Sequence, residues 1–221
     1  MKKPYYEHGG ITIYHGDCRE IMPTLEPVDL VLTDPPYGIG EARTGNATRS
    51  ALAVSRDYGD ASWDDAPPVR ETIDAVVAAG TNAIVFGGNY FALPASPCWL
   101  VWDKDNGAND FADCELAWTN LSTAVRRIRW RWQGMLQEHG GNHKEARQHP
   151  TQKPLAVMKW CIERVPGNPQ TILDPFMGSG TTLRAAKDLH RKAIGIEIDE
   201  RYCEIAANRL RQNVLPLAVS E

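Results

Sequence analysis

The sequence of 221 residues lacks any run of about 18 apolar residues, the length that a helix needs to cross a bilayer. Its first residues, 1–8, also lack the apolar stretch of a signal peptide. The five cysteines are scattered and form no Cys-x-x-Cys pair, which predicts reduced thiols in a cytoplasmic protein. These absences argue against a membrane protein and against a secreted domain held together by disulfides.

An excess of basic residues is missing as well. Lys and Arg number 24 against 28 Asp and Glu, and the net charge of −4 argues against non-specific coating of nucleic acid, although a local basic patch can still bind DNA. His139, His143 and His149 lie close in sequence, but no cysteine or second ligand set accompanies them, so we predict no metal site. There is no internal repeat or low-complexity tract. The length and the 43% hydrophobic content are typical of one globular domain.

The most informative stretch follows the apolar run 29–33, which predicts a buried strand. Asp34-Pro35-Pro36-Tyr37 comes directly after it. Two prolines remove two N–H donors, so the loop offers only acceptors, the Asp34 carboxylate and backbone carbonyls, next to the flat ring of Tyr37. This combination suits the exocyclic amino group of a planar base. Its nitrogen is a poor nucleophile, and hydrogen bonds to Asp34 and to the Pro35 carbonyl would stabilise the positive charge developing on it. The alternative is a structural turn with Tyr37 in the core.

A second constellation runs from Asp174 to Glu197. A strand at 171–174 leads into a glycine turn at 175–180, a helix at 181–189 and a strand at 192–196. This layout predicts a nucleoside site in which Glu197 accepts both ribose hydroxyls. Leu183 stands where a dinucleotide site has a third glycine, and Gly180 is followed by Thr181-Thr182 where a phosphate loop has Lys-Ser/Thr. S-adenosylmethionine, which has no pyrophosphate, fits this pattern; a purely structural turn is the alternative.

Further apolar runs predict strands at 11–14, 82–86, 98–102 and 114–119, and amphipathic patterns predict helices at 19–25, 69–79, 155–165 and 201–212. Their alternation predicts an α/β fold with a doubly wound, mostly parallel sheet. Residues 38–66 lack such patterns and carry Arg43, Arg49 and Arg56. We expect a mobile functional loop there.

One basic segment stands out in this acidic chain. Residues 121–153 hold seven Lys or Arg and two acids, and 127–132 alternate strictly as Arg-Ile-Arg-Trp-Arg-Trp. As one strand, this segment places Ile128, Trp130 and Trp132 on one face and three arginines on the other. Arginines between tryptophans suit contact with phosphates and stacking on bases. An edge strand whose tryptophans cover the core is the alternative.

Taken together, these motifs resemble those of the amino-group DNA methyltransferases, the N4-cytosine/N6-adenine family. The order resembles the circularly permuted branch, in which the catalytic motif precedes the cofactor motif. The resemblance extends to 15–18, 85–89, 101–104 and to His149-Pro-Thr-Gln-Lys-Pro154, which is similar to the segment that holds the methionine end of the cofactor. It implies a single domain with a seven-stranded Rossmann-like sheet containing one antiparallel strand, base flipping, and a target-recognition insertion of only about 120–148. So short an insertion implies a short or relaxed recognition sequence.

The resemblance also assigns roles. It implies catalysis by Asp34, Pro35, Pro36 and Tyr37. It implies S-adenosylmethionine contacts from Asp17, Cys18, Asp34, His149, Thr151, Lys153, Asp174, Phe176, Gly178, Gly180, Thr181, Thr182 and Glu197, with Lys153 facing the cofactor carboxylate. We interpret Arg43, Arg49, Arg56, Arg127, Arg129, Trp130 and Arg131 as contacts to double-stranded DNA.

The aspartate that opens the catalytic tetrad favours adenine N6, because serine is commoner there in enzymes that methylate cytosine N4. Members of the branch are often dimers, so a homodimer is a further expectation. Three alternatives stay open: an amino group of RNA or protein as the target, a non-catalytic DNA-binding protein on the same scaffold, and a nicotinamide-dependent oxidoreductase, against which Leu183 counts.

Overall fold

The computed structural model describes residues 2–39, 66–107, 112–133, 136–138, 145 and 152–211. The strands of its main sheet are β1 (Tyr6–His8), β2 (Ile11–His15), β3 (Val28–Thr33), β4 (Gly80–Phe86), β5 (Trp99–Asp103), β6 (Cys114–Thr119), β7 (Arg126–Arg129), β10 (Thr171–Asp174) and β11 (Lys192–Glu197). The helices are α1 (Cys18–Ile21), α3 (Arg70–Ala78), α4 (Leu155–Arg164), α5 (Thr181–Asp188) and α6 (Glu200–Arg211), with 3₁₀ turns η1 (Met22–Thr24) and η3 (Gly88–Tyr90). In the described ranges no helix is both long and apolar enough to cross a bilayer.

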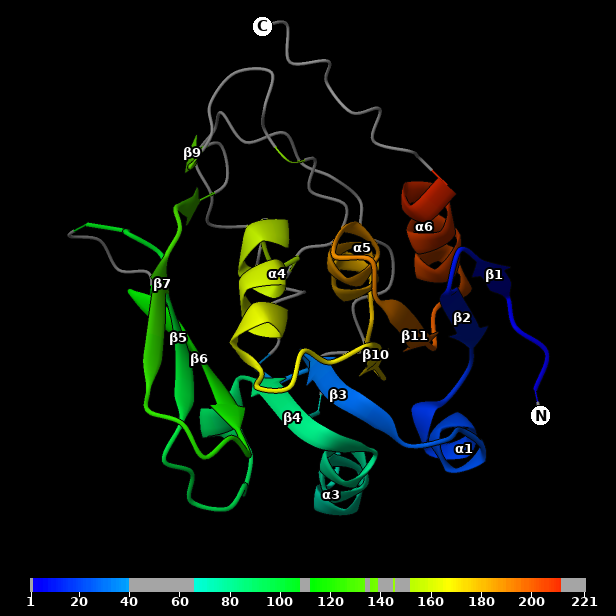
Figure 1. Cartoon of the computed structure of the whole chain (residues 1–221), viewed down its shortest axis with the longest axis horizontal. Coiled ribbons are helices and arrows are strands. Elements are labelled where there is room, and N and C mark those ends of the chain that lie inside the picture. The colour runs from blue at the N-terminus through cyan, green and yellow to red at the C-terminus, as the bar shows by residue number, and fades with distance from the viewer. Residues whose placement is uncertain are drawn as a thin grey trace, which may run out of the picture.

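The sheet has the strand order β1-β2-β11-β10-β3-β4-β6-β5-β7. The run from β2 to β4 is parallel, β6 is antiparallel to both of its neighbours, and β7 pairs parallel with β5. Helices α4, α5 and α6 cover one face, while α1 and α3 cover the other (Figure 1). The predicted α/β fold with a mostly parallel sheet is therefore confirmed.

The predicted number of seven strands is wrong for the described part of the chain, where the main sheet has nine. Seven of them form the expected arrangement with one antiparallel strand. The additional β1 is a three-residue strand that folds back on β2 through Gly9 and Gly10, both at positive φ. The additional β7 extends the opposite edge along β5. Both additions sit at sheet edges, where a strand needs only one partner and the sequence pattern is weak.

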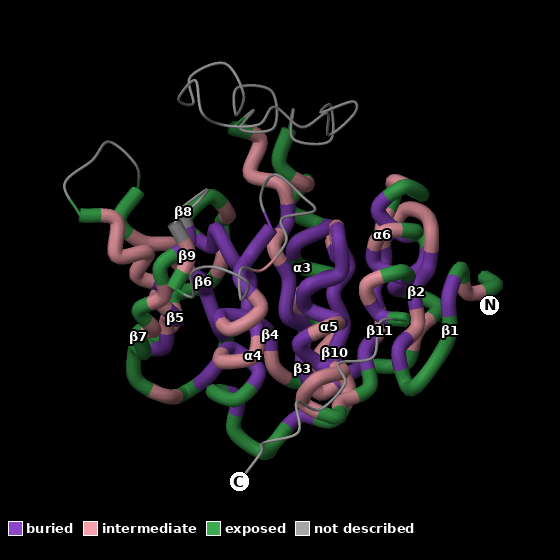
Figure 2. Tube along the Cα trace, turned by 90° about the horizontal axis from the view of Figure 1, so that it is seen from above, coloured by how far each residue is buried: buried purple, intermediate pink, exposed green. Residues whose placement is uncertain are grey.

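The central strands are buried on both faces, which explains their nearly continuous apolar runs. Along β3, Leu30 and Leu32 pack into the cluster beneath α4, α5 and α6, whereas Val31 packs into the cluster beneath α1 and α3. Figure 2 shows these strands as buried segments between the more exposed edges of the sheet. The rigid centre of the fold thereby fixes the positions of the loops that follow β3, β10 and β11.

The segment 127–132, predicted as one strand, is divided. β7 ends at Arg129, and Trp132 belongs to β8 (Trp132–Gln133), which forms a separate hairpin with β9 (Leu136–Gln137). The cause is the length of the neighbouring strand, because β5 ends at Asp103 and Trp130 already donates its N–H to the Asp103 carbonyl. Beyond that point the chain has no sheet partner and turns away.

Candidate active site

The parallel strands β2, β11, β10 and β3 are consecutive neighbours, so their carboxyl ends meet at one edge of the sheet. Each end carries an acid: Asp17 follows β2, Asp34 follows β3, and Asp174 and Glu197 close β10 and β11. Together they surround a cavity of about 630 Å³. Its size and its place at the strand ends are those of a ligand site in an open α/β sheet.

Eleven of the residues predicted to act in catalysis or cofactor binding line this cavity. They are Asp17, Cys18, Asp34, Pro36, Lys153, Asp174, Phe176, Gly178, Thr181, Thr182 and Glu197. Pro35, Tyr37 and Gly180 lie beside the lining residues but outside the lining itself. His149 and Thr151 fall outside the described residues, as do Arg43, Arg49 and Arg56.

The predicted catalytic loop, residues 34–37, is held by hydrogen bonding and by aromatic contacts. The Tyr37 hydroxyl donates to Asp34 Oδ1 at 2.5 Å. Tyr90 stacks on the Tyr37 ring with centroids 4.8 Å apart and planes 13° from parallel, and Phe91 meets the ring edge-on. Gly87 packs against the same ring, and a Cβ there would lie 2.1 Å from Tyr37 Cε1. The Tyr37 ring therefore already accepts a parallel planar partner.

Lys153 lies between two carboxylates. Its Nζ donates to Asp34 Oδ2 at 2.6 Å and lies 3.0 Å from Glu115 Oε2, while Lys104 Nζ is 2.7 Å from Glu115 Oε1. The contact to Oε2 is an ion pair without hydrogen-bond geometry. Burial raises the pKa of Asp34, and the Lys153 charge opposes that rise. Burial also works against the charge on Lys153, yet Asp34 and Glu115 raise its pKa and keep it an ammonium.

Asp174 joins the two predicted motifs. Its carboxylate accepts from the Thr33 hydroxyl at 2.7 Å and from the Thr182 hydroxyl at 2.5 Å, and it also accepts the Phe176 N–H at 3.2 Å. Burial raises its pKa to about 6. Because Thr33 directly precedes Asp34, this carboxylate fixes the start of the catalytic loop relative to the glycine turn.

Glu197 ends β11 at the wall of the cavity. Its Oε2 accepts the Gly178 N–H and its Oε1 accepts the Asp199 N–H, each at 2.9 Å. Burial raises its pKa to about 7. Asp17 follows the neighbouring strand β2, caps α1 and pairs with Arg19, whose hydrogen bonds lower the pKa of Asp17. Burial raises the pKa of the Cys18 thiol to about 11, so this thiol stays protonated at neutral pH.

Sequence reasoning missed the residues that support the glycine turn. Arg209 on α6 donates to the Ser179 carbonyl at 2.6 Å and to its hydroxyl at 3.0 Å. Glu145 accepts from Gln152 and from the Leu155 N–H, each at 3.0 Å, and lies 3.6 Å from Arg209. Arg209 and Glu145 lie far apart in the chain, and neither belongs to a recognisable motif.

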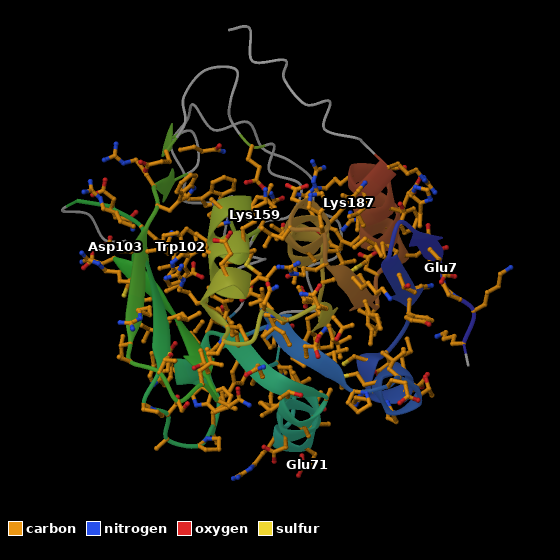
Figure 3. All side chains as sticks on the ribbon, viewed as in Figure 1. Glu7, Glu71, Trp102, Asp103, Lys159 and Lys187 are labelled. Atoms are coloured by element: carbon orange, nitrogen blue, oxygen red, sulfur yellow. The ribbon has the colours of Figure 1, made fainter. Side chains whose placement is uncertain are left out.

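The basic segment has the geometry of its structural alternative, an edge strand. Trp130 and Ile128 pack partly against the core, and Trp102 donates its ring N–H to the Trp130 carbonyl at 2.8 Å. The arginines face solvent: Arg127 reaches Asp103, and Arg129 and Arg131 both reach Asp105. Figure 3 shows Trp102 and Asp103 at this edge of the sheet. Exposed arginines on an edge remain available to phosphates, so their contact with DNA stays a prediction.

Comparison with known proteins decides the family. Residues 99–208 match a family of proteins described as DNA methylase. The chain is 43% identical over 219 residues to the type II methyltransferase M.HpaI of Haemophilus parainfluenzae, covering 83% of this chain and 68% of that protein. It is 27% identical to M2.LlaDCHI of Lactococcus lactis subsp. cremoris, covering 96% and 93%. The chain belongs to the N6/N4 amino DNA methyltransferase family.

Solved structures agree with this assignment. The crystal structure of the M1.HpyAVI–SAM complex aligns with a TM-score of 0.55 at 26% identity, covering 90% of this chain and 99% of that one. PvuII DNA methyltransferase, described as cytosine-N4-specific, aligns with a TM-score of 0.59 at 17% identity, which shows a shared fold only.

As an amino DNA methyltransferase, the chain uses S-adenosylmethionine, and its cavity fits this cofactor. The half-buried ring of Phe176 and the exposed side chain of Ile198 provide apolar surfaces in the lining. Glu197 lines the cavity with them, and its role as the acid that accepts ribose hydroxyls stays a prediction. Gly178 keeps the turn free of side-chain bulk, with φ at +49°.

Proposed function

We propose that this amino DNA methyltransferase methylates N6 of adenine in double-stranded DNA, after flipping the base out of the helix. The supporting observation is the Asp34 carboxylate. It is fixed between the Tyr37 hydroxyl and Lys153 Nζ at the wall of the cofactor cavity. An acceptor fixed in this way can receive a hydrogen bond from an amino group and stabilise the positive charge that develops on its nitrogen.

The chemistry is divided between the loop and the cofactor. When bound, S-adenosylmethionine supplies an electrophilic methyl group. Asp34 and the Pro35 carbonyl accept the two amino N–H bonds of the target base, and Tyr37 stacks on its ring. The parallel Tyr90 ring supports the stacking role, because it shows that the Tyr37 face accommodates a planar partner. Adenine is favoured over cytosine because the tetrad begins with aspartate.

Chain order supports a circularly permuted member of the family. The catalytic strand β3 precedes both cofactor strands, β10 and β11. The proposed recognition insertion at about 120–148 includes β7 and the β8–β9 hairpin, and the proposed loop at about 38–66 lies mostly outside the described residues. A homodimer remains a prediction.

The direct test is to incubate the protein with unmethylated DNA and S-adenosylmethionine, digest the DNA to nucleosides and analyse them by mass spectrometry. N6-methyladenine is the expected product. Detection of N4-methylcytosine would make cytosine the target base in place of adenine and leave the proposed mechanism unchanged. Cofactor binding with neither product would contradict catalysis on DNA and support the non-catalytic scaffold. Sequencing the methylated DNA then gives the recognition site. A single site of six or more bases would contradict the proposed short or relaxed recognition sequence.

Cofactor affinity should depend on pH through Glu197. Its pKa of about 7 lies above the ordinary 4.5, so the carboxyl is mostly protonated below pH 7 and ionised above it. Ribose hydroxyls donate best to the ionised form. We therefore expect S-adenosylmethionine affinity to rise by up to about tenfold per pH unit below 7 and to level off above it. Calorimetric titration from pH 5.5 to 8.5 measures this change in affinity.

Glu197→Gln should bind S-adenosylmethionine about 10- to 100-fold more weakly at pH 8 and lose this part of the pH dependence. Glu200 is exposed, so Glu200→Gln should behave as wild type.

DNA affinity should depend on Arg129 and Arg131. Each arginine that neutralises a phosphate contributes about 0.9 to the slope of log affinity against log salt concentration. The Arg129→Ala/Arg131→Ala double variant should therefore bind DNA more weakly and show a slope smaller by about 1.8. Fluorescence anisotropy across salt concentrations measures both effects. Arg164→Ala, at the far end of α4, is the matched control. Slopes equal to wild type in the double variant would remove these arginines from the interface.

A further inference from the structure

The cationic side chain of Lys153 connects the catalytic loop to the other half of the sheet. Lys153 precedes α4 and is only 6% exposed. Its Nζ contacts Asp34, which follows β3, and Glu115, which lies on β6. Glu115 in turn contacts Lys104, which follows β5. Four separate segments are thereby joined by one alternating series of charges, with two anions balanced by two cations.

This arrangement fixes the Asp34 carboxylate at both of its oxygens. Oδ1 accepts from the Tyr37 hydroxyl and Oδ2 accepts from Lys153 Nζ. Lys153 is itself confined, because Nζ lies 5.3 Å from the centroid of the Phe86 ring and 5.7 Å from that of Tyr37. Glu115 gives the ammonium a second counter-ion, so Lys153 stays in place when Asp34 engages a substrate. A buried ammonium without such a partner would be costly.

We propose that Lys153, held by Glu115, is a positioning residue that orients the Asp34 carboxylate toward the target amino group, and that its main partner is Asp34 and not the carboxylate of the cofactor. This inference rests on the proposed function for the identity of the target. It assigns a role to Glu115, which no motif marks, and it differs from the interpretation of Lys153 drawn from the sequence. Lys104 supports Glu115 from the solvent side.

The charges of Lys153 and Glu115 shift the pKa of Asp34 in opposite directions. The charged and titratable groups facing Asp34 are Lys153, Glu115, Tyr37 and Asp174. The Lys153 charge lowers the pKa of Asp34, so its removal should raise that pKa. The Glu115 charge raises the pKa of Asp34, so its removal should lower that pKa. A Lys153 side chain that contacted the cofactor and not Asp34 would leave the titration of Asp34 unchanged on removal.

The experiment follows Asp34 directly and requires no turnover. Carboxyl resonances of protein labelled with ¹³C-aspartate are titrated by NMR, with Asp34 assigned by its absence in Asp34→Asn. The variants are Lys153→Met, Lys153→Arg and Glu115→Gln. Lys159→Met is the matched control, because Lys159 on α4 (Figure 3) pairs with Asp188 and neither residue lines the cavity. S-adenosylmethionine affinity and the single-turnover methylation rate against pH are measured on the same samples.

We expect the pKa of Asp34 to rise in Lys153→Met, to fall in Glu115→Gln, and to match wild type in Lys159→Met. Cofactor affinity should stay within about threefold while the methylation rate falls by about 10²-fold in Lys153→Met, with partial recovery in Lys153→Arg. Cofactor affinity lowered more than about 30-fold in Lys153→Met, with an unchanged Asp34 titration, would overturn the proposal. Wild-type protein that methylates no DNA would refute the proposed function instead, and the titration would still decide the role of Lys153.

Discussion

Asp34→Ala should reduce the methylation rate by about 10³-fold or more while the protein keeps its fold. Alanine removes both the acceptor for the amino group and the negative charge that stabilises its developing cation, and one such interaction is worth about 10²- to 10³-fold. Lys153 retains Glu115 as a counter-ion, so the charge left behind is not isolated. Single-turnover kinetics measure the rate, and a melting curve reports the fold.

Asp74→Ala provides the control for this experiment. Asp74 lies on α3 and forms an exposed ion pair with Arg70, so its loss removes a carboxylate without touching the cavity. We expect wild-type rates from this variant. A rate for Asp34→Ala within tenfold of wild type would show that another group accepts the amino hydrogen bond.

Gly87→Ala should reduce the methylation rate by about 10²-fold through displacement of Tyr37. The new Cβ would lie 2.1 Å from Tyr37 Cε1, so the ring must move and lose its hydrogen bond to Asp34. Gly87 also has φ at +64°, where a side chain costs about 1–2 kcal/mol. We expect a lower free energy of unfolding in denaturant titrations and a larger proportional loss in single-turnover rate.

Gly167→Ala separates these two effects. Gly167 has φ at +81°, but a Cβ there meets nothing within 4 Å. Gly167→Ala should therefore lower the free energy of unfolding through its positive φ and keep the methylation rate. If both variants lost activity equally, the position of Tyr37 would not be the cause.

Much of the fold and of the cavity could be predicted because short apolar runs end in distinctive polar groups. The strands before Asp34, Asp174 and Glu197 were each recognisable from composition, and alternation with helices predicted that their carboxyl ends share an edge. The catalytic motif and the glycine turn therefore came together as expected. The edge strand β1 and the division of 127–132 were not predicted. Strand length depends on the neighbouring strand, as the end of β5 at Asp103 shows.

The contacts among side chains could not be predicted from the sequence either. Lys153 and Asp34 are 119 positions apart, and Glu115 belongs to a strand whose sequence marks it only as part of the sheet. Tyr90 likewise follows a strand with no sign that its ring would cover Tyr37. Such pairings depend on which loops face each other across the sheet edge, and periodicity carries no information about them.

The pairing of β2 with β11 has a consequence for how the protein is made. Residues 11–15 find their parallel partner at residues 193–197, so the chain from 11 to 197 must leave the ribosome before β2 and β11 can pair. Pairings of such long range slow folding and leave strand edges open to aggregation meanwhile. Because Glu197 lies on this late strand, the proposed contact to the cofactor ribose forms only after β11 has been made. A translation product that stops before β11 would lack the partner strand of β2 and the cavity-lining Glu197.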